Sequence, residues 1–251
     1  MHRVFLKLGP VTIYSYGVMM ALAFLSSIFM LSYIFYKNGK PKELSFDLSI
    51  TVMLSSIIGA RIFYILTNLS FFTKNPSEML KVYHGGLVYY GGFIGALIGG
   101  FIFVKIKKFR FLELADLVMP VVSLGQSIGR IGCFLNGCCY GHETTCSLGV
   151  KFPVLHDNIC RIPTQLYSTL GNLLIFFFLM WRLSKKKFNG EIICYYLMSY
   201  GTFRFIIEFF RGDPRGGIYF HMFSISQVVS LVAIFVGIIF FSVKKLRTKQ
   251  K

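Results

Sequence analysis

Three arginines stand in or at the ends of long apolar stretches: Arg61, Arg130 and Arg204. At the centre of a bilayer a guanidinium costs about 2.5–3.5 kcal/mol on insertion scales, so it normally faces a protein interior or a wet cavity. Glu113 or Asp116 could simply neutralise Arg61, but acids are few along the chain. A planar guanidinium donates two parallel hydrogen bonds to phosphate, so the three arginines indicate an anionic guest. Inside a bilayer, that guest is a phospholipid headgroup.

A polar stripe surrounds Arg204. Glu208 follows Arg204 by four residues, so on a helix the two side chains share a face and can form an ion pair. Tyr200 and Arg211 lie on the same face. Internal pairing is one interpretation of these four residues, and contact with a ligand is the other. We expect a functional role, because charged residues within membrane spans usually mark functional sites.

His84 begins a glycine-rich segment, His-Gly-Gly-Leu-Val-Tyr-Tyr-Gly-Gly, that ends at Gly92. An imidazole with a pKa near neutrality could act as a general base or contact a phosphate. A lone histidine at an interface is more often a structural hydrogen bonder, and both roles stay open. Gly91, Gly95 and Gly99 recur every four residues and predict close helix packing.

The sequence Gly-Gln-Ser-Ile-Gly at residues 125–129 matches a hydrolase nucleophile pattern. That pattern has meaning only on a strand-to-helix turn of an α/β sheet. Here it lies inside an apolar stretch, where glycine and serine favour helix packing. We therefore do not expect an intramembrane serine protease, for which Ser127 would be the nucleophile.

The chain has six cysteines, and their spacing matches no zinc pattern built from paired Cys-x-x-Cys or His-x-x-x-His elements. Three interpretations stay open. Cysteines are often buried as small packing residues, and Cys146 and Cys160 could form a disulfide on an oxidising exterior. Alternatively, Cys138, Cys139, Cys146 and His142 could bind zinc. We expect packing, and no bound metal or cofactor.

The composition indicates that a membrane surrounds these residues. Of 251 residues, 55% are hydrophobic and 15% are charged, whereas about a quarter are charged in a soluble domain. The apolar runs, of about 20 residues each, can cross the hydrocarbon core as helices, and we expect the first to span rather than to be a removable signal peptide. We expect one all-α polytopic membrane domain, residues 1–251, without internal repeats. The seven or so predicted spanning helices are residues 11–36, 47–67, 86–104, 112–135, 163–181, 191–210 and 223–242.

Lysine and arginine counts in the connections predict the orientation. One side holds sixteen: Lys37, Lys40, Lys42, Lys105, Lys107, Lys108, Arg110, Arg182, Lys185, Lys186, Lys187, Lys244, Lys245, Arg247, Lys249 and Lys251. The other side holds eight: Arg3, Lys7, Lys74, Lys81, Lys151, Arg161, Arg211 and Arg215. The richer side is cytoplasmic, so the N-terminus lies outside, the C-terminus inside, and the connection of residues 136–162 faces outward. Because the net charge of +17 lies mostly in such connections, we expect no nucleic-acid partner.

Six motifs, in this order along the chain, resemble those of prolipoprotein diacylglyceryl transferases. The longest, Gly-Arg-Ile-Gly-Cys-Phe-Leu-Asn-Gly-Cys-Cys-Tyr-Gly, covers residues 129–141. The others are Tyr16-Gly17, Gly59-Ala60-Arg61, the His84 segment, Pro163-Thr164-Gln165-Leu166-Tyr167, and Arg-Phe-Ile-Ile-Glu-Phe-Phe-Arg at residues 204–211. One such motif would be weak evidence, but the ordered set extends from about residue 16 to residue 213 and is specific.

The resemblance implies a multi-pass transferase of the bacterial cytoplasmic (inner) membrane that performs the first step of lipoprotein maturation. Such enzymes transfer the sn-1,2-diacylglyceryl group of phosphatidylglycerol to the lipobox cysteine of a prelipoprotein signal peptide, forming a thioether. The partners implied are these two substrates and the membrane lipids. The implied catalytic residues are His84, Arg130 and Arg204. The residues expected to bind substrate are Tyr16, Arg61, Asn136, Gly141, Tyr200, Glu208 and Arg211.

Two positions depart from the common family pattern, in which many members have Asn in place of Cys133 and Glu in place of Cys138. Losing an amide and a carboxylate beside Arg130 removes potential headgroup contacts. A catalytically altered paralogue that binds lipid or a membrane partner is therefore one alternative function. An anion transporter is another, but that class predicts inverted repeats, which the sequence does not display.

The predicted orientation is testable with reporter fusions placed after Lys108, Lys187 and Lys251. Each site follows a connection rich in lysine and arginine. All three fusions should therefore report a cytoplasmic location. A periplasmic or extracellular signal from any two of them would overturn the orientation.

Overall fold

The computed structural model describes residues 2–9, 11–81, 85–145, 147–212, 218–219 and 223–249. The chain divides into two compact units. The first comprises residues 1–31 and 115–251, and the second comprises residues 32–114. Helix α1 (Ser15–Lys37) begins in the first unit and ends in the second. That all 251 residues form one membrane domain stays a prediction.

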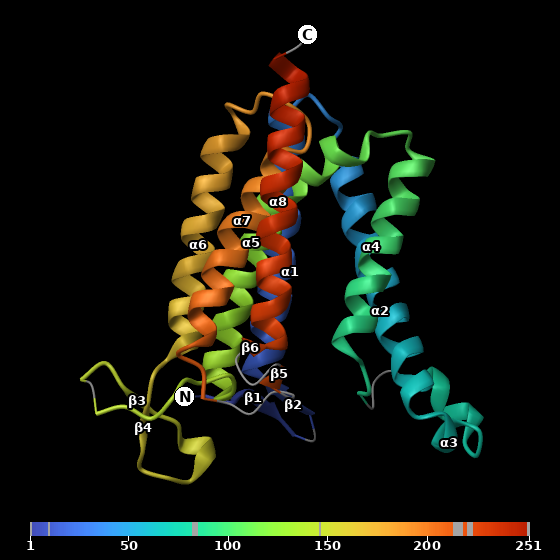
Figure 1. Cartoon of the computed structure of the whole chain (residues 1–251). Helices are drawn as coiled ribbons and strands as arrows, with labels where there is room; N and C mark the ends of the chain where they lie inside the picture. The colour runs from blue at the N-terminus through green and yellow to red at the C-terminus, as the bar shows by residue number, and fades with distance from the viewer. Residues whose placement is uncertain are drawn as a thin grey trace. The chain divides into compact units, whose positions relative to one another are not determined.

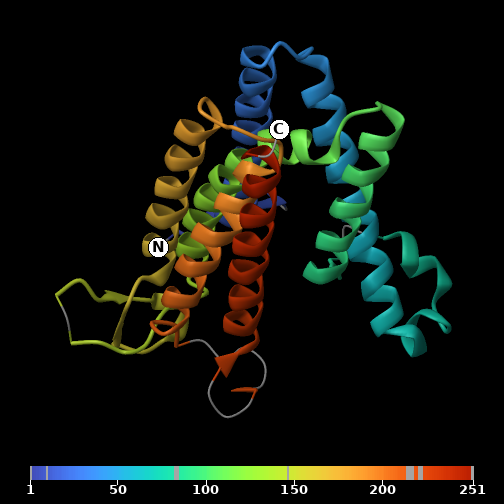
Figure 2. The same ribbon diagram turned by 45° about the horizontal axis from the view of Figure 1, so that its top comes forward.

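The first unit contains the larger parts of α1 and of α5 (Phe111–Asn136), together with three further long helices (Figures 1 and 2). These are α6 (Thr164–Leu183), α7 (Glu191–Glu208) and α8 (Ile225–Lys249). Helix α7 packs against both α6 and α8. A Cβ added at Gly201 of α7 would lie 2.8 Å from Ile234 Cγ1 and 3.0 Å from Ser230 O of α8. The absence of a side chain at Gly201 therefore lets α7 and α8 approach closely.

Asp116 of α5 holds the first turn of α7. Its carboxylate accepts hydrogen bonds from the backbone N–H groups of Gly190, Ile192 and Ile193 at 2.8, 2.9 and 3.2 Å. The Asp116 side chain is completely buried, and Lys186 Nζ lies 3.5 Å away. A carboxylate at this position satisfies N–H groups that have no partner within the helix and complements the helix dipole. The start of α7 is thereby fixed against α5.

The second unit is built around two helices that lie side by side, α2 and α4 (Figure 1). Its elements are α2 (Glu43–Thr67), α3 (Leu69–Phe72), the 3-10 helix η1 (Pro76–Leu80) and α4 (Tyr89–Ile106). A Cβ added at Gly59 would lie 2.9 Å from Gly95 Cα, and one at Gly95 would overlap Ser55 O. The predicted close packing at the glycine stripe is therefore confirmed, because the two backbones touch where a Cβ has no space.

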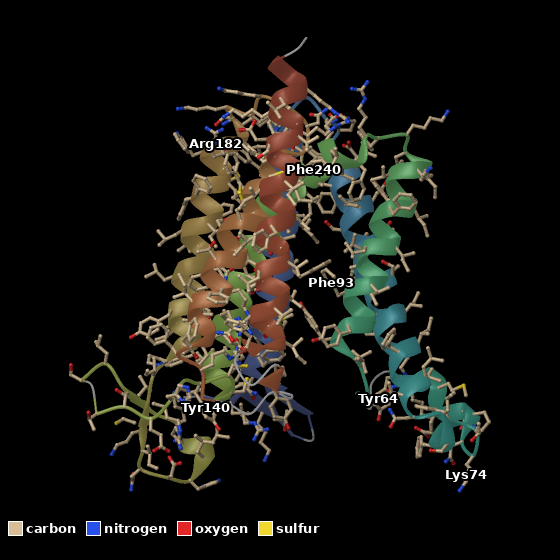
Figure 3. All side chains as sticks on the ribbon, in the orientation of Figure 1. Tyr64, Lys74, Phe93, Tyr140, Arg182 and Phe240 are labelled. Atoms are coloured by element: carbon tan, nitrogen blue, oxygen red, sulfur yellow. The ribbon has the colours of Figure 1, made fainter. Side chains whose placement is uncertain are left out.

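Three two-stranded antiparallel sheets accompany the helices of the first unit. They pair β1 (Val4–Leu8) with β2 (Val11–Tyr14), β3 (Val150–Lys151) with β4 (Cys160–Arg161), and β5 (Ile218–Tyr219) with β6 (Phe223–Ser224); the 3-10 helix η3 (Pro153–Leu155) lies between β3 and β4. All three sheets lie at one end of this unit's helices, and the C-terminal end of α8 lies at the other (Figure 1). Tyr140 marks the sheet end and Arg182 the opposite end (Figure 3). The sheet end carries the connections for which an outward location is predicted.

Arg161 holds part of the connection of residues 136–162 together. Its guanidinium donates to both carboxylate oxygens of Asp157 at 2.8 Å and to Glu143 Oε1 at 3.3 Å. Hydrogen bonding to Arg161 lowers the pKa of Asp157 below its usual value and raises the pKa of Arg161. The contact therefore persists as the pH falls through the ordinary aspartate range and is lost only below it.

In the part of the chain that the structure describes, six helices are long and apolar enough to cross a membrane: α1, α2, α4, α5, α6 and α8. They match six of the seven predicted spans to within a few residues at most ends. Helix α1 begins at Ser15, later than predicted, because residues 11–14 pair with β1 as a strand. The seventh predicted span is α7, whose 18 residues include Glu191, Arg204 and Glu208. The helical, polytopic membrane fold is confirmed, and its orientation stays a prediction.

Replacing Gly95 by alanine should destabilise the protein, because the new methyl group would overlap Ser55 O. Overpacking of this kind typically costs about 1–3 kcal/mol. Gly100→Ala is the matched control, since a Cβ there would meet nothing within 4 Å. Thermal unfolding of the purified protein in detergent should show a lower midpoint for Gly95→Ala alone. A midpoint no lower than that of Gly100→Ala would contradict the close α2–α4 contact.

Candidate active site

The C-terminal end of α7 carries the ion pair expected from the spacing of its residues. Arg204 Nη2 lies 2.7 Å from Glu208 Oε2, and the two side chains are only 14% and 11% exposed. Arg211 Nε lies 4.0 Å from the same Glu208 oxygen. The predicted internal pairing is therefore present, and two guanidinium groups share one carboxylate.

The first turn of α8 holds both members of this pair. Arg204 Nη2 donates to Ser226 Oγ at 3.0 Å, and Ser224 Oγ donates to Glu208 Oε1 at 3.0 Å. Ser224 and Gln227 bond each other reciprocally: Ser224 N donates to Gln227 Oε1 at 2.9 Å, and Gln227 N donates to Ser224 Oγ at 3.2 Å. Sequence reasoning missed these residues, although Ser-x-x-Gln before an apolar run is the signature of a helix-capping box.

Arg130 lies half-buried in α5. Among the described residues, no acid forms an ion pair with it. Its guanidinium is within electrostatic range of Tyr16 on α1 and of Arg204 on α7, and Arg204 is also within range of Arg211. Arg204 thus has two other guanidinium groups within electrostatic range, Arg130 and Arg211, and it pairs with the carboxylate of Glu208. Such an excess of positive charge is suited to an anion such as phosphate.

Gly141 is the point at which three chain segments meet. Its N–H donates to Ile162 O at 2.8 Å, and it forms an isolated β-bridge with Arg211. A Cβ added at Gly141 would overlap Phe210 O and lie 2.8 Å from Ile162 Cβ. Only glycine fits where the connection after α5, the segment before α6 and the end of α7 come together, so Gly141 positions the backbone at Arg211.

Two more predicted site residues lie in the first unit. Tyr200 stacks on Tyr196, with ring centroids 5.3 Å apart and an interplanar angle of 7°, and Tyr200 is within electrostatic range of Arg204. Asn136 is the last residue of α5. The first unit therefore contains Tyr16, Arg130, Asn136, Gly141, Tyr200, Arg204, Glu208 and Arg211.

Arg61 belongs to the second unit and is 8% exposed. Its guanidinium donates to five backbone carbonyls, at distances of 2.5 to 3.2 Å. These carbonyls belong to Glu78, Met79, Lys81, Gly85 and Gly86. Arg61 thus binds the backbone on both sides of residues 82–84. His84 itself, the predicted base, lies outside the described residues.

Glu113 and Asp116, the two acids that could neutralise Arg61, have other contacts. Glu113 Oε1 lies 2.7 Å from Lys40 Nζ, and Asp116 binds the start of α7. The hydrolase-like pattern is also explained by packing, because Ser127 lies inside α5 and its hydroxyl donates to Thr169 O of α6 at 2.8 Å. The structure therefore favours the helix-packing interpretation of residues 125–129.

Five of the six cysteines are described, and none of these five forms a disulfide. Cys146 lies outside the described residues, so its predicted bridge to Cys160 stays a prediction. Of the residues weighed for zinc, Cys138 and Cys139 lie together with Cys133 rather than with a histidine. Cys194 is fully buried in α7, as expected for a packing residue.

The chain is similar to known proteins over nearly its whole length. The family model of prolipoprotein diacylglyceryl transferase matches residues 3–243. The phosphatidylglycerol–prolipoprotein diacylglyceryl transferase of Clostridium tetani is 39% identical over 250 residues, 98% of this chain and 99% of the relative. A second such transferase, of Clostridium perfringens, is 35% identical over 95% of this chain and 94% of the relative. That of Finegoldia magna is 32% identical over the same shares.

The matched residues include all six motifs, from Tyr16 on α1 to Arg211 after α7. Identity above 30% also extends over nearly the full length of both chains for each of these relatives. The likeness is therefore that of the whole membrane protein rather than of one motif. The chain belongs to the prolipoprotein diacylglyceryl transferase family.

Proposed function

We propose that this protein transfers the sn-1,2-diacylglyceryl group of phosphatidylglycerol to the lipobox cysteine of prelipoproteins in the bacterial inner membrane. The names of its relatives support the two substrates. In this reaction the cysteine sulfur attacks the glyceryl carbon that bears the phosphate ester. The carbon–oxygen bond breaks, a thioether forms, and glycerol phosphate leaves with the bonding electron pair.

The position of Arg204 carries this proposal: it pairs with Glu208, and the guanidinium groups of Arg130 and Arg211 lie within electrostatic range of it. The departing phosphate gains negative charge, and fixed cations in a poorly hydrated site stabilise such charge strongly. Arg130 has no acid partner among the described residues, and Arg204 shares Glu208 with Arg211. We therefore assign the donor phosphate to Arg130 and Arg204. Glu208, held by Ser224, fixes the orientation of the Arg204 guanidinium.

The acceptor thiol needs a base, because the thiolate rather than the thiol is the nucleophile. We assign this role to His84, on the strength of its residue type and its place in the motif of residues 84–92. Arg61 binds the carbonyls that flank residues 82–84. This bonding supports a positioning role for Arg61, which holds the backbone beside His84. Its charge alone led us to expect direct contact with the substrate instead.

Supporting roles follow from the contacts of the remaining residues. We assign Tyr16 and Tyr200, which lie within electrostatic range of Arg130 and Arg204 respectively, to the donor headgroup. Asn136 is assigned to the same region. Gly141 and Arg211 connect the end of α7 to the connection after α5, and we assign them to keeping that end of the site in shape.

A catalytically altered paralogue is the second candidate, favoured by the cysteines at positions 133 and 138. One experiment separates it from the transferase. The purified protein is incubated with phosphatidylglycerol and a lipobox peptide, and the peptide is analysed by mass spectrometry. A transferase adds one diacylglyceryl unit to the cysteine, whereas a lipid-binding paralogue leaves the peptide unchanged.

In this assay Arg130→Lys should lose activity, because lysine keeps the charge but lacks the bidentate fork. Arg204→Ala should lose more, on the order of 10²- to 10³-fold, as when a donor to a developing anion is removed. Arg110→Lys is the matched control, since Arg110 is exposed and lies outside the site. Wild-type rates for both Arg130→Lys and Arg204→Ala would contradict the assignment of the donor phosphate.

The Arg204–Glu208 pair calls for a double variant as a further control. Arg204→Ala alone leaves Glu208 buried without its closest cation, so part of its effect reflects folding. Arg204→Ala with Glu208→Ala should recover thermal stability relative to the single variant. It should not recover turnover. Recovery of both would mean that Arg204 serves only to neutralise Glu208.

His84→Gln should fold and bind donor lipid but transfer slowly. The loss should shrink as the pH rises, because the acceptor thiol then ionises without help from a base. Rates are measured by the same mass assay across the pH range, with His142→Gln as the control at an exposed position of the outward connection. A near-wild-type rate of His84→Gln across neutral pH would return His84 to a structural role.

A further inference from the structure

Three thiols converge at the C-terminal end of α5. The Sγ atoms of Cys133, Cys138 and Cys139 all lie within 4.8 Å of one another, and those of Cys138 and Cys139 are 3.7 Å apart. All three side chains are half-buried. Cys133 belongs to the last turn of α5, and the other two follow directly after the helix. The proposed reaction assigns no role to this cluster.

The backbone is folded so that the thiols must face each other. Cys138 N donates to Cys133 O at 3.1 Å. The chain then turns through two left-handed positions, Gly137 with φ 74° and Cys139 with φ 67°. A left-handed conformation is uncommon for a residue other than glycine and persists only where the surroundings enforce it.

Two buried side chains of α6 enforce that conformation. Gln165 Nε2 donates to Cys138 O, and Thr164 Oγ1 donates to Cys139 O, each at 2.7 Å. Thr164 is 2% exposed and Gln165 is fully buried. Because both carbonyls of the turn are bound to α6, the turn cannot rotate without breaking buried hydrogen bonds. The backbone that carries Cys138 and Cys139 is therefore fixed against α6.

We propose that these three thiols bind one soft divalent cation, of which Zn²⁺ and Cd²⁺ are the probes. Thiolates are the ligands that such ions prefer. A zinc–sulfur distance of about 2.3 Å places neighbouring sulfurs about 3.8 Å apart around a tetrahedral ion. The Cys138–Cys139 distance already has this value, and the other pairs need to close by at most about 1 Å. Three protein ligands leave the fourth position for water or an external ligand.

Binding of the cation displaces the protons of the three thiols. The cation forms three bonds to sulfur, the three S–H groups release three protons to solvent, and the bound ion with three thiolates carries one net negative charge. Arg130, one helical turn before Cys133, supplies positive charge beside it. Tyr16 is within electrostatic range of all three cysteines and of Arg130. Asn136, the last residue of α5, lies between Cys133 and Cys138 in the chain.

The alternative to metal binding is that the cysteines only fill space in the protein interior. This explanation suits Cys194 but not the three clustered cysteines. Cys194 is completely buried in α7. The three clustered thiols are instead partly accessible and lie near one another. Packing requires no such convergence, whereas coordination of one ion does.

The test uses the purified full chain in detergent, reduced with a phosphine and freed of metal. Titration with Cd²⁺ should produce sulfur-to-cadmium charge-transfer absorption that saturates at one equivalent, and Zn²⁺ should compete for the site. Cys133→Ser, Cys138→Ser and Cys139→Ser should each weaken binding by more than the roughly 10- to 100-fold that loss of an outer-shell contact causes. Cys194→Ser and Cys160→Ser are the matched controls and should bind as the wild type does.

A second measurement needs no variant and therefore survives any folding defect. Cd²⁺ should protect Cys133, Cys138 and Cys139 of the wild-type chain from alkylation, as read by peptide mass mapping, while Cys160 stays reactive. No saturable absorption, binding that the three serine variants leave unchanged, or protection of Cys160 alone would overturn the proposal. Both readouts measure binding, so a chain that binds Cd²⁺ but transfers no lipid would contradict only the proposed transferase function.

Discussion

The carboxylate of Glu208 has to balance positive charge in a place that is largely shielded from water, and the end of α7 is organised by this requirement. Arg204 approaches to 2.7 Å and Arg211 to 4.0 Å. The acid lowers the cost of holding these two cations there, because an unpaired guanidinium is costly in a low-dielectric environment. Glu208 in turn depends on Ser224 at the start of α8. Glu208, whose spacing from Arg204 predicts only a pair within one helix, thus also links α7 to the start of α8.

The same balance leaves charge available for chemistry. No described acid pairs with Arg130, and its guanidinium lies within electrostatic range of Arg204. Near these residues, the connection after α5 meets the end of α7 at Gly141. The proposed transfer from an anionic phospholipid would use this positive charge, because cations that are fixed before the substrate arrives stabilise a developing anion.

Helix α7 is anchored at both ends by polar contacts, which explains how a helix with three charged residues keeps its position. At its start, Asp116 binds three backbone N–H groups, and Glu191 forms an ion pair with Arg182. At its end, the contacts of Glu208 hold it against α8. The charged side chains of α7 make it less apolar than the other long helices. They have ion-pair and hydrogen-bond partners within the first unit, so they need not face lipid.

The sequence by itself determined the class of protein, the helices and the family. Hydrophobic runs of about 20 residues predict spanning helices from length alone, and the order of six motifs identified the family. The i, i+4 spacing of Arg204 and Glu208 predicted their pairing, because helix geometry is local. The tertiary structure alone decided which distant residues meet. Arg61 binds backbone carbonyls. Ser224 and Ser226 form hydrogen bonds with Glu208 and Arg204 of α7. Three cysteines whose spacing matches no metal pattern lie close together. Such contacts depend on how helices far apart in the chain pack and on turns such as that at Gly137 and Cys139, which residue spacing does not encode.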